Sequence, residues 1–314
     1  MDGPTSFATR CLPFGAPALA EAAYLIGEGL PVAVATDTVY GLAADATNAR
    51  AVAAIYAAKG RPSFNPLIVH VARQAAAEAL ALFDADARAL AAAFWPGPLT
   101  LVLPLRPEAG IASLATAGLP TVALRVPAHR AIQALIEASG KPLAAPSANA
   151  SGSISPTRAA HVLMSLADRI PLVLDDGPCP AGLESTIVMT GVPPRLLRPG
   201  PITAEAIAAV LGRPLAEAPG GIIAPGSLAS HYAPAKPLRL NATRAAPDEW
   251  LIGFGSVPGN DTLSATGDLV EAAATLFDAL HAADAAPEPR IAVAPVPVEG
   301  MGAAINDRLA RAAH

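Results

Sequence analysis

Cysteine is scarce in this sequence, because the 314 residues include only Cys11 and Cys179. Two thiols so far apart in the chain exclude a disulfide framework and a cysteine-based zinc site. Charged residues are also sparse at 15%, and aromatic residues make up 4%. With 53% apolar residues and a net charge of −5, the chain is neither disordered nor a strong binder of nucleic-acid phosphates.

Long hydrophobic runs are missing as well. The longest stretch without a charged residue or a histidine, residues 89–105, contains three prolines and a glycine, which argues against a membrane-spanning helix. The N-terminus carries Asp2, Arg10 and Glu21 and lacks the basic-then-apolar pattern of a secretory signal. We therefore expect a folded, cytoplasmic protein in a reducing compartment.

Several common motifs are absent. The sequence contains neither a G-x-x-x-x-G-K-[ST] phosphate loop nor a G-x-S-x-G nucleophile elbow. Gly253-Phe254-Gly255 follows an apolar run, but Pro258 stands where a dinucleotide-binding loop needs its third glycine. The six histidines include no close pair, which argues against a metalloprotease or zinc site.

Apolar residues alternate between helical and strand spacing over the first two hundred residues. This pattern predicts strands over residues 31–35, 67–71, 99–103, 121–126, 172–174 and 186–189. It predicts helices around 19–26 and 52–56, and over 84–94, 128–139, 156–168 and 203–211. Ser155 and Pro156 are typical of a helix start, and Gly140 and Gly212 of helix ends. Strands separated by helices at unequal spacing favour a mixed α/β sheet.

The pattern breaks at residues 213–237, which contain eight prolines and glycines. A connection of that length and composition is typical of a linker or a functional lid. Beyond it, strands are predicted over 238–240, 250–254 and 291–296, with a helix over 269–283. We therefore predict a first domain over 1–212, a linker or lid over 213–237, and a small α/β domain over 238–314.

Polar segments stand where the predicted strands and helices end. There are seven of them: residues 36–42, 59–70, 121–127, 146–156, 184–188, 198–200 and 231–234. Each has a plain structural explanation, such as hydroxyl groups bonded to their own backbone, a capped loop, or a tyrosine that anchors a loop by packing. The functional alternative is a ligand site assembled from several of these segments.

Lys59 and Arg61 are consistent with two roles. Two cations at a helix C-terminus complement its partial negative charge. Alternatively they form an anion site, because lysine offers a point charge and arginine a fork that suits phosphate oxygens. His70 lies within the apolar run 67–71, where a histidine is more often a satisfied core group than a ligand contact.

The strand over residues 121–126 has a polar face. Its two-residue period puts Thr121, Ala123 and Arg125 on one side. Four residues of strand span about 13 Å, enough to flank an elongated ligand with a small alanine floor between. The alternative is an edge strand with one solvated face, and the sequence leaves both interpretations open.

Taken together and in this order, the polar segments resemble the threonylcarbamoyl-AMP synthase family, the YrdC-like proteins. The resemblance covers about residues 16–211, and His231-Tyr232-Ala233-Pro234 is similar to the linker of the longer, two-domain branch. It implies a YrdC-like mixed twisted sheet with helices, followed by a smaller Rossmann-like α/β domain. The chain has Asp37 where the family more often has glutamate, which shortens that side chain by one methylene.

The resemblance implies an adenylyl transfer in which L-threonine, bicarbonate and ATP give threonylcarbamoyl-AMP and pyrophosphate. Mg²⁺ would accompany ATP, without a metal bound by protein ligands. The product would serve a downstream transferase complex that modifies an adenosine of tRNA, with little direct nucleic-acid binding by this chain and no membrane contact.

The resemblance also assigns roles to individual residues. Those on the threonine side would be Thr38, His70, Arg125, Ala145 and Ser185. Those that hold the nucleotide would be Arg61, Asn65, Thr121, Ser147, Ser155, Arg198 and Tyr232. Those that offset phosphate charge during catalysis would be Lys59, Arg61 and Arg198. The linker that carries Tyr232 would close over the site and exclude water.

Three alternatives compete with this assignment. One is an RNA-binding module without catalysis, against which the acidic net charge argues. Another is a carbamoyl-adenylate enzyme of the hydrogenase-maturation type, whose zinc-binding cysteine pairs this chain cannot supply. The third is a regulator that binds nucleotide without turnover.

Overall fold

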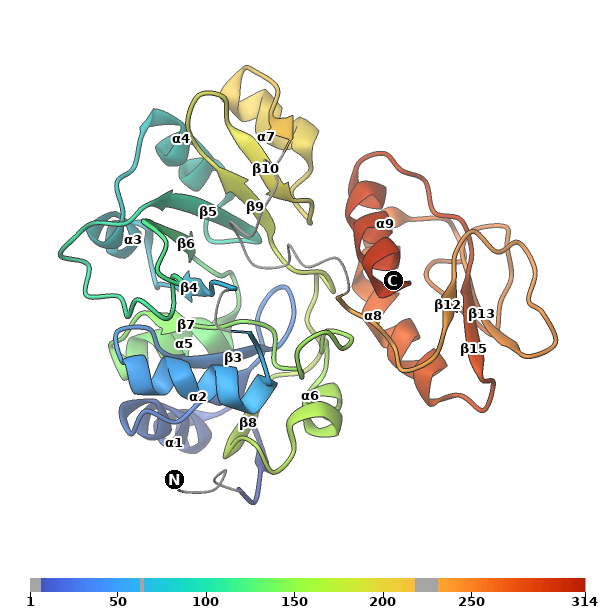
Figure 1. Ribbon diagram of the computed structural model, residues 1–314, viewed down its shortest axis with the longest axis horizontal. Helices are drawn as coiled ribbons and strands as arrows, with labels where there is room; N and C mark the ends of the chain where they lie inside the picture. Colours follow the sequence, from blue (N-terminus) through green and yellow to red (C-terminus); the bar gives the residue numbers. More distant parts are fainter. Residues whose placement is uncertain (1–6, 63–64, 218–230, 314) are drawn as a thin grey trace.

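A computed structural model describes residues 7–62, 65–217 and 231–313 of the chain. Figure 1 shows two parts, each built on its own sheet. We call residues 7–217 the N-terminal part and residues 231–313 the C-terminal part. Residues 218–230 of the predicted linker lie outside the described residues. Within the described ranges, no helix combines the length and apolarity that a membrane crossing requires.

The N-terminal part is built on one mixed sheet, as the alternating pattern predicted. Its neighbouring strands pair either in parallel or antiparallel: the strand Val32–Val34 is parallel to Leu172–Asp175 and antiparallel to Gly41–Asp45. In spatial order the strands are β1 (Arg10–Pro13), β8 (Leu172–Asp175), β2 (Val32–Val34), β3 (Gly41–Asp45), β7 (Leu143–Ala144), β4 (Ile68–His70), β6 (Thr121–Arg125), β5 (Leu99–Pro104), β9 (Thr186–Met189), β10 (Arg195–Arg198) and β11 (Ala216–Glu217).

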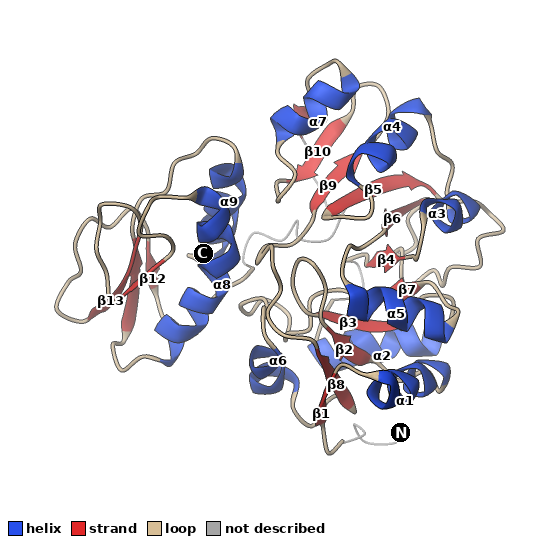
Figure 2. Ribbon diagram, turned by 180° about the vertical axis from the view of Figure 1, so that it is seen from behind, coloured by secondary structure: helices blue, strands red, loops and turns tan. Residues whose placement is uncertain are grey.

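Helices cover both faces of this sheet (Figure 2). Val32 and Val34 share an apolar cluster with α1 and α5, whereas Ala33 between them belongs to the cluster of α2 and α4. This separation follows from the two-residue period of a strand, which sends neighbouring side chains to opposite faces. The helices are α1 (Ala16–Gly27), α2 (Ala49–Lys59), α3 (Gln74–Leu80), α4 (Ala85–Phe94), α5 (Arg130–Ser139), α6 (Ala159–Leu166) and α7 (Ala204–Leu211).

The C-terminal part is a small parallel sheet with two helices. Its strands lie in the order β12 (Leu238–Arg239), β15 (Arg290–Val293), β13 (Glu249–Gly253) and β14 (Asp261–Thr262). The helices are α8 (Leu269–Ala285) and α9 (Met301–Ala312). Both helices lie on the side of this sheet that faces the N-terminal part (Figures 1 and 2).

The two parts are in close contact. Val39, Ile154 and Leu183 of the N-terminal part belong to the same apolar cluster as the core of the C-terminal part. Gly182 has a φ of +67°, and a Cβ there would lie 2.4 Å from the carbonyl oxygen of Ala273 in α8. Only glycine allows both this backbone conformation and this approach. The segment that ends in Leu183 is therefore held directly against helix α8.

Most predicted elements are confirmed, and two local predictions were wrong. Gly140 and Gly212 end their helices in the left-handed conformation, as predicted. Ser155, however, does not cap a helix: α6 begins at Ala159, and the Ser155 hydroxyl donates to Glu184 instead. The edge-strand alternative for residues 121–126 was also wrong, since β6 lies between β4 and β5.

Candidate functional site

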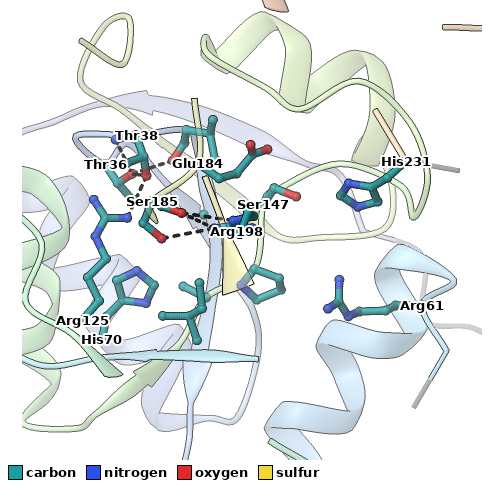
Figure 3. A pocket seen from close by; sticks show the side chains of 15 residues that line it. Thr36, Thr38, Arg61, His70, Arg125, Ser147, Glu184, Ser185, Arg198 and His231 are labelled. Atoms are coloured by element: carbon teal, nitrogen blue, oxygen red, sulfur yellow. Dashed lines mark hydrogen bonds between the residues drawn. The ribbon is translucent and has the colours of Figure 1, made fainter. Parts of the chain in front are cut away.

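One pocket lies where several strands of the large sheet end (Figure 3). Its walls come from the loop after β2, the ends of β4, β6 and β10, the loop after β7, and the segment before β9. Binding residues are often found on loops that a rigid scaffold positions, and pockets at such sheet edges commonly hold ligands. The lining residues are Thr36, Thr38, Val39, Gly41, Arg61, Ile68, His70, Arg125, Ala145, Pro146, Ser147, Glu184, Ser185, Arg198 and His231.

Arg125 is clamped at one end of the pocket. Its Nε donates to the Gly97 carbonyl oxygen at 3.1 Å, and its Nη1 donates to Thr38 Oγ1 at 2.8 Å. Its Nη2 lies 2.5 Å from Asp37 Oδ1. A guanidinium has five N–H groups, so donors remain for a ligand carboxylate after these three contacts. The buried Arg125 side chain is thus held in place and still able to bind an anion.

The hydroxyl groups of the loop after β2 bond to their own backbone, and the same loop lines the pocket. Thr36 Oγ1 accepts from the Thr38 backbone N–H at 3.1 Å and donates to the Val39 carbonyl oxygen at 2.6 Å. These bonds are the local backbone satisfaction that the sequence suggested. Because Arg125 also contacts this loop, the same bonds fix one wall of the pocket.

His70 ends strand β4 and faces the pocket in Figure 3. Among the described residues its Nδ1 has no hydrogen-bond partner. Burial, together with the nearby Arg125 charge, lowers the pKa of His70 to about 3. The imidazole is therefore neutral near pH 7 and leaves one ring nitrogen for a ligand.

Lys59 contacts the loop that contributes Pro146 and Ser147 to the pocket lining. It is the last residue of α2, and its Nζ donates to the carbonyl oxygens of Ser147 and Asn149, each at 2.5 Å. Burial, together with the Arg61 charge, lowers the pKa of Lys59 well below its usual range. Lys59 thus joins the 147–149 loop to α2, in addition to offsetting the partial negative charge at the C-terminus of its own helix.

Arg198 is held by the segment before β9. Its Nε and Nη2 both donate to the Ser185 carbonyl oxygen, at 3.0 and 2.9 Å. Ser185 Oγ in turn shares a hydrogen bond of 2.7 Å with Thr100 Oγ1. These contacts fix the guanidinium at the pocket wall. Nη1 donates to no acceptor among the described residues, so its N–H groups are available to a ligand.

Glu184 is a pocket-lining residue to which the sequence analysis assigned no role. It lines the pocket while being almost fully buried, and its Oε1 accepts from Ser155 Oγ at 2.5 Å. Its Oε2 accepts from Arg308 Nε of helix α9 at 2.9 Å. The acidic residue was visible at the start of the segment 184–188, but no pattern in the sequence pointed to a partner 124 residues away.

The structure brings most of the predicted residues together. All five predicted on the threonine side line the pocket, as do Arg61, Ser147 and Arg198 from the nucleotide side. In the described part of the chain, the other predicted residues lie outside the lining: Lys59, Asn65, Thr121, Ser155 and Tyr232. Tyr232 is 0% exposed and packs with the apolar core of the C-terminal part, whereas its neighbour His231 reaches the pocket.

Stability should depend on pH through the buried imidazoles. Burial lowers the pKa of both His70 and His231 to about 3, so the folded state leaves them neutral while the unfolded chain takes up protons below about pH 6.5. The free energy of unfolding should therefore fall as the pH drops from about 6.5 toward 3. Urea denaturation at pH 7.5, 6.0 and 5.0 measures this. His70→Gln should flatten the decline, and an unchanged slope in that variant would contradict the assignment.

Comparisons with known proteins cover nearly the whole chain. The family model described as "Telomere recombination" matches residues 24–200, and the one described as "Threonylcarbamoyl-AMP synthase, C-terminal domain" matches residues 202–314. The threonylcarbamoyl-AMP synthase of Bacillus subtilis is 42% identical, over 95% of this chain and 93% of that protein. The one from Pyrococcus abyssi is 39% identical, over 93% and 92%.

A solved structure supports the same grouping. P. abyssi Sua5, described as complexed with L-threonine, superposes with a TM-score of 0.88 at 36% identity and covers 97% of each chain. The similarity thus extends over both parts of the molecule and confirms the fold that the polar segments implied. This chain belongs to the threonylcarbamoyl-AMP synthase family.

Proposed function

We propose that the pocket joins L-threonine, bicarbonate and ATP into threonylcarbamoyl-AMP and pyrophosphate. One observation carries the proposal: Thr38, His70, Arg125, Ala145 and Ser185 come from five separate segments and line a single pocket. The threonine in the related P. abyssi structure is consistent with this use of the pocket.

L-Threonine would be oriented by the clamped end of the pocket. The free donors of Arg125 suit its carboxylate, since a guanidinium binds carboxylate oxygens in a planar fork. Thr38 and Ser185 offer hydroxyl groups and His70 a neutral ring nitrogen for the substrate's polar atoms. A contact with the threonine methyl group distinguishes threonine from serine by only about 1–3 kcal/mol. A hydrogen-bond partner for the threonine hydroxyl distinguishes it from valine more strongly.

ATP would bind beside Arg61, Ser147 and Arg198, which line the same pocket. The threonine amine adds to carbon dioxide from bicarbonate and loses a proton, which gives a carbamate. A carbamate oxygen then attacks the α-phosphorus, and the bond to pyrophosphate breaks. This sequence needs no protein nucleophile, so positioning and neutralisation of phosphate charge by Lys59, Arg61 and Arg198 supply the catalysis.

Mg²⁺ would enter as part of the MgATP substrate. Among the described residues, no group of three histidine, cysteine or acidic side chains is arranged to hold a metal ion. Glu184, which lines the pocket, pairs with Arg308, and Asp37, which lies between the lining residues Thr36 and Thr38 in sequence, pairs with Arg125. An ion that bridges phosphate oxygens would offset the charge of the departing pyrophosphate.

The product implies a further partner. A mixed anhydride of a carbamate and AMP hydrolyses readily, so a transferase that passes the threonylcarbamoyl group to a tRNA adenosine must consume it soon after release. We place this reaction in the cytoplasm, where tRNA is modified.

Pyrophosphate release from ATP tests the proposal. The enzyme is incubated with MgATP and bicarbonate, alone or with L-threonine, serine or valine. Release that depends on the amino acid and is fastest with threonine supports the synthase. ATP binding without stimulation by any amino acid would favour the regulator that binds nucleotide without turnover.

A further inference from the structure

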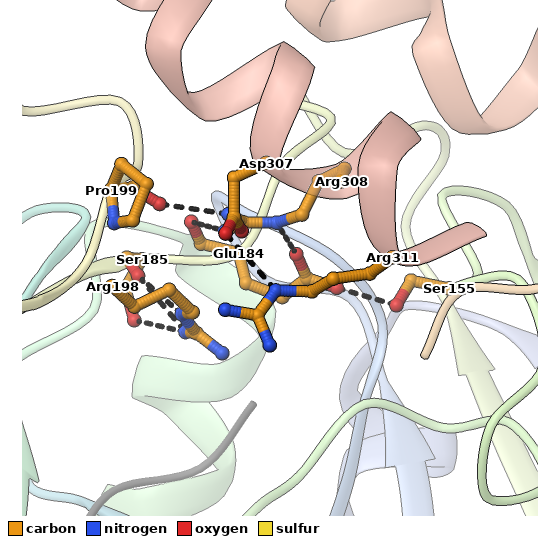
Figure 4. Close-up of polar contacts among 8 residues, drawn as sticks. All are labelled: Ser155, Glu184, Ser185, Arg198, Pro199, Asp307, Arg308 and Arg311. Atoms are coloured by element: carbon orange, nitrogen blue, oxygen red, sulfur yellow. Dashed lines mark hydrogen bonds and ion pairs between the residues drawn. The ribbon is translucent and has the colours of Figure 1, made fainter. Parts of the chain in front are cut away.

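Arg308 of helix α9 is fully buried, although it carries a charge and belongs to the C-terminal part (Figure 4). Its Nε donates to Glu184 Oε2 at 2.9 Å, and its Nη1 donates to the Pro199 carbonyl oxygen at 2.9 Å and to Asp307 Oδ2 at 2.8 Å. Two of these acceptors lie in the N-terminal part. Arg308 therefore reaches across the boundary and ends at the wall of the pocket.

Docking of the two parts does not require a charge at this place. Val39, Ile154 and Leu183 already give the boundary an apolar core, and burial of an ion pair contributes little net stability compared with apolar packing. A guanidinium removed from water is costly unless its donors are bonded. The pairing with Glu184 thus points to a role in the pocket that apolar packing cannot supply.

Glu184 is the pocket-lining carboxylate next to Ser185, whose backbone carbonyl holds Arg198. Burial alone would raise the pKa of Glu184, but the charges of Arg308 and Arg198 hold it below its ordinary value. Glu184 is therefore an anion in a pocket that must accept the phosphates of ATP. Without a dedicated counter-charge it would repel them and compete for Arg198.

We propose that Arg308 is a positioning residue for ATP: it neutralises Glu184 from outside the pocket, so that Arg198 stays available to the nucleotide. This inference rests on the proposed function, because it assumes that the pocket binds ATP. It gives the C-terminal part a direct contribution to the nucleotide site through a side chain that itself lies outside the lining.

Equilibrium binding in four proteins tests this role: the wild type, Arg308→Gln, Glu184→Gln and the double variant. We expect Arg308→Gln to weaken ATP binding about tenfold while leaving L-threonine affinity within about twofold. In the Glu184→Gln background the same substitution should change ATP affinity by less than about twofold, because the repelling carboxylate is gone.

A purely structural role would give a different pattern. Arg308→Gln would then weaken both ligands alike, and the loss would persist in the Glu184→Gln background, which would overturn the proposal. Arg239→Gln is the matched control, since Arg239 pairs with the buried Glu249 in the same part, away from the pocket lining. It should leave ATP affinity unchanged.

Folding of each variant is checked by thermal denaturation before binding is measured. If Arg308→Gln does not fold, Arg308→Lys replaces it, because it keeps the charge with fewer donors. That variant should retain ATP affinity within about threefold, and an equal loss for both ligands would overturn the proposal. Failure of the wild type to bind ATP would instead reject the proposed function itself.

Discussion

Replacing Lys59 with methionine should lower the rate of threonine-dependent pyrophosphate release by about 10²–10³-fold. Methionine is unbranched and of similar length, so it fills the buried position while removing the charge and the donors. The Ser147 and Asn149 carbonyl oxygens would lose the donor that ties their loop to α2. Ser147 lines the pocket, so the substitution disturbs both the position of that wall and the field at the phosphates.

The electrostatic part of this effect depends on the bound nucleotide. Two N–H groups of Lys59 are used on carbonyl oxygens, and the ammonium form offers a third. The pKa of Lys59 is lowered by burial in the free protein, and the approach of a polyanion raises it again. ATP binding should therefore favour the charged form at the moment when phosphate charge must be offset.

Lys141→Met is the matched control for this prediction. The Lys141 side chain is 49% exposed, and its Nζ lies 3.8 Å from Asp45 Oδ2. Because an exposed ion pair contributes little, this substitution should change the rate by less than about twofold. The measurement is steady-state pyrophosphate release with saturating ATP and threonine. A Lys59→Met enzyme that keeps a third or more of the wild-type rate would contradict the role assigned to Lys59.

Elements with a strong local pattern were predictable from the sequence. The strand Leu99–Pro104 and helix α5 have clear apolar periodicity, and Gly140 marks the end of that helix. Strand β3 was missed because Gly41–Asp45 consists mostly of small residues, is buried throughout and has no alternation. Helix α9 was missed because it follows Gly300 without a side-chain cap, so no start signal marks it.

The site was predictable to the extent that its residues stand in local motifs. Arg125 and His70 were recognised in their segments, but whether they meet is decided by strand order, which periodicity does not reveal. The polar face of residues 121–126 left an edge strand open as an alternative, because a buried arginine needs partners that the sequence does not display. Asp37 and Thr38 are those partners, supplied by the loop after β2.

Replacing Arg125 with glutamine should have two separable effects. The affinity for L-threonine should fall about 100-fold, because the fork that suits its carboxylate is lost. The protein should also lose about 3–5 kcal/mol of stability, because Asp37 is left buried without its cation. Calorimetric titration with threonine and urea denaturation measure the two effects independently.

A second substitution separates the two effects of losing Arg125. The double variant Asp37→Asn/Arg125→Gln has no uncompensated carboxylate, so much of the lost stability should return while threonine affinity stays low. Arg130→Gln is the matched arginine control, because Arg130 is 74% exposed and pairs with Asp176 outside the pocket lining. It should leave both threonine affinity and stability close to wild type. If the double variant regains threonine affinity together with stability, Arg125 only supports the loop after β2 and the carboxylate is bound elsewhere.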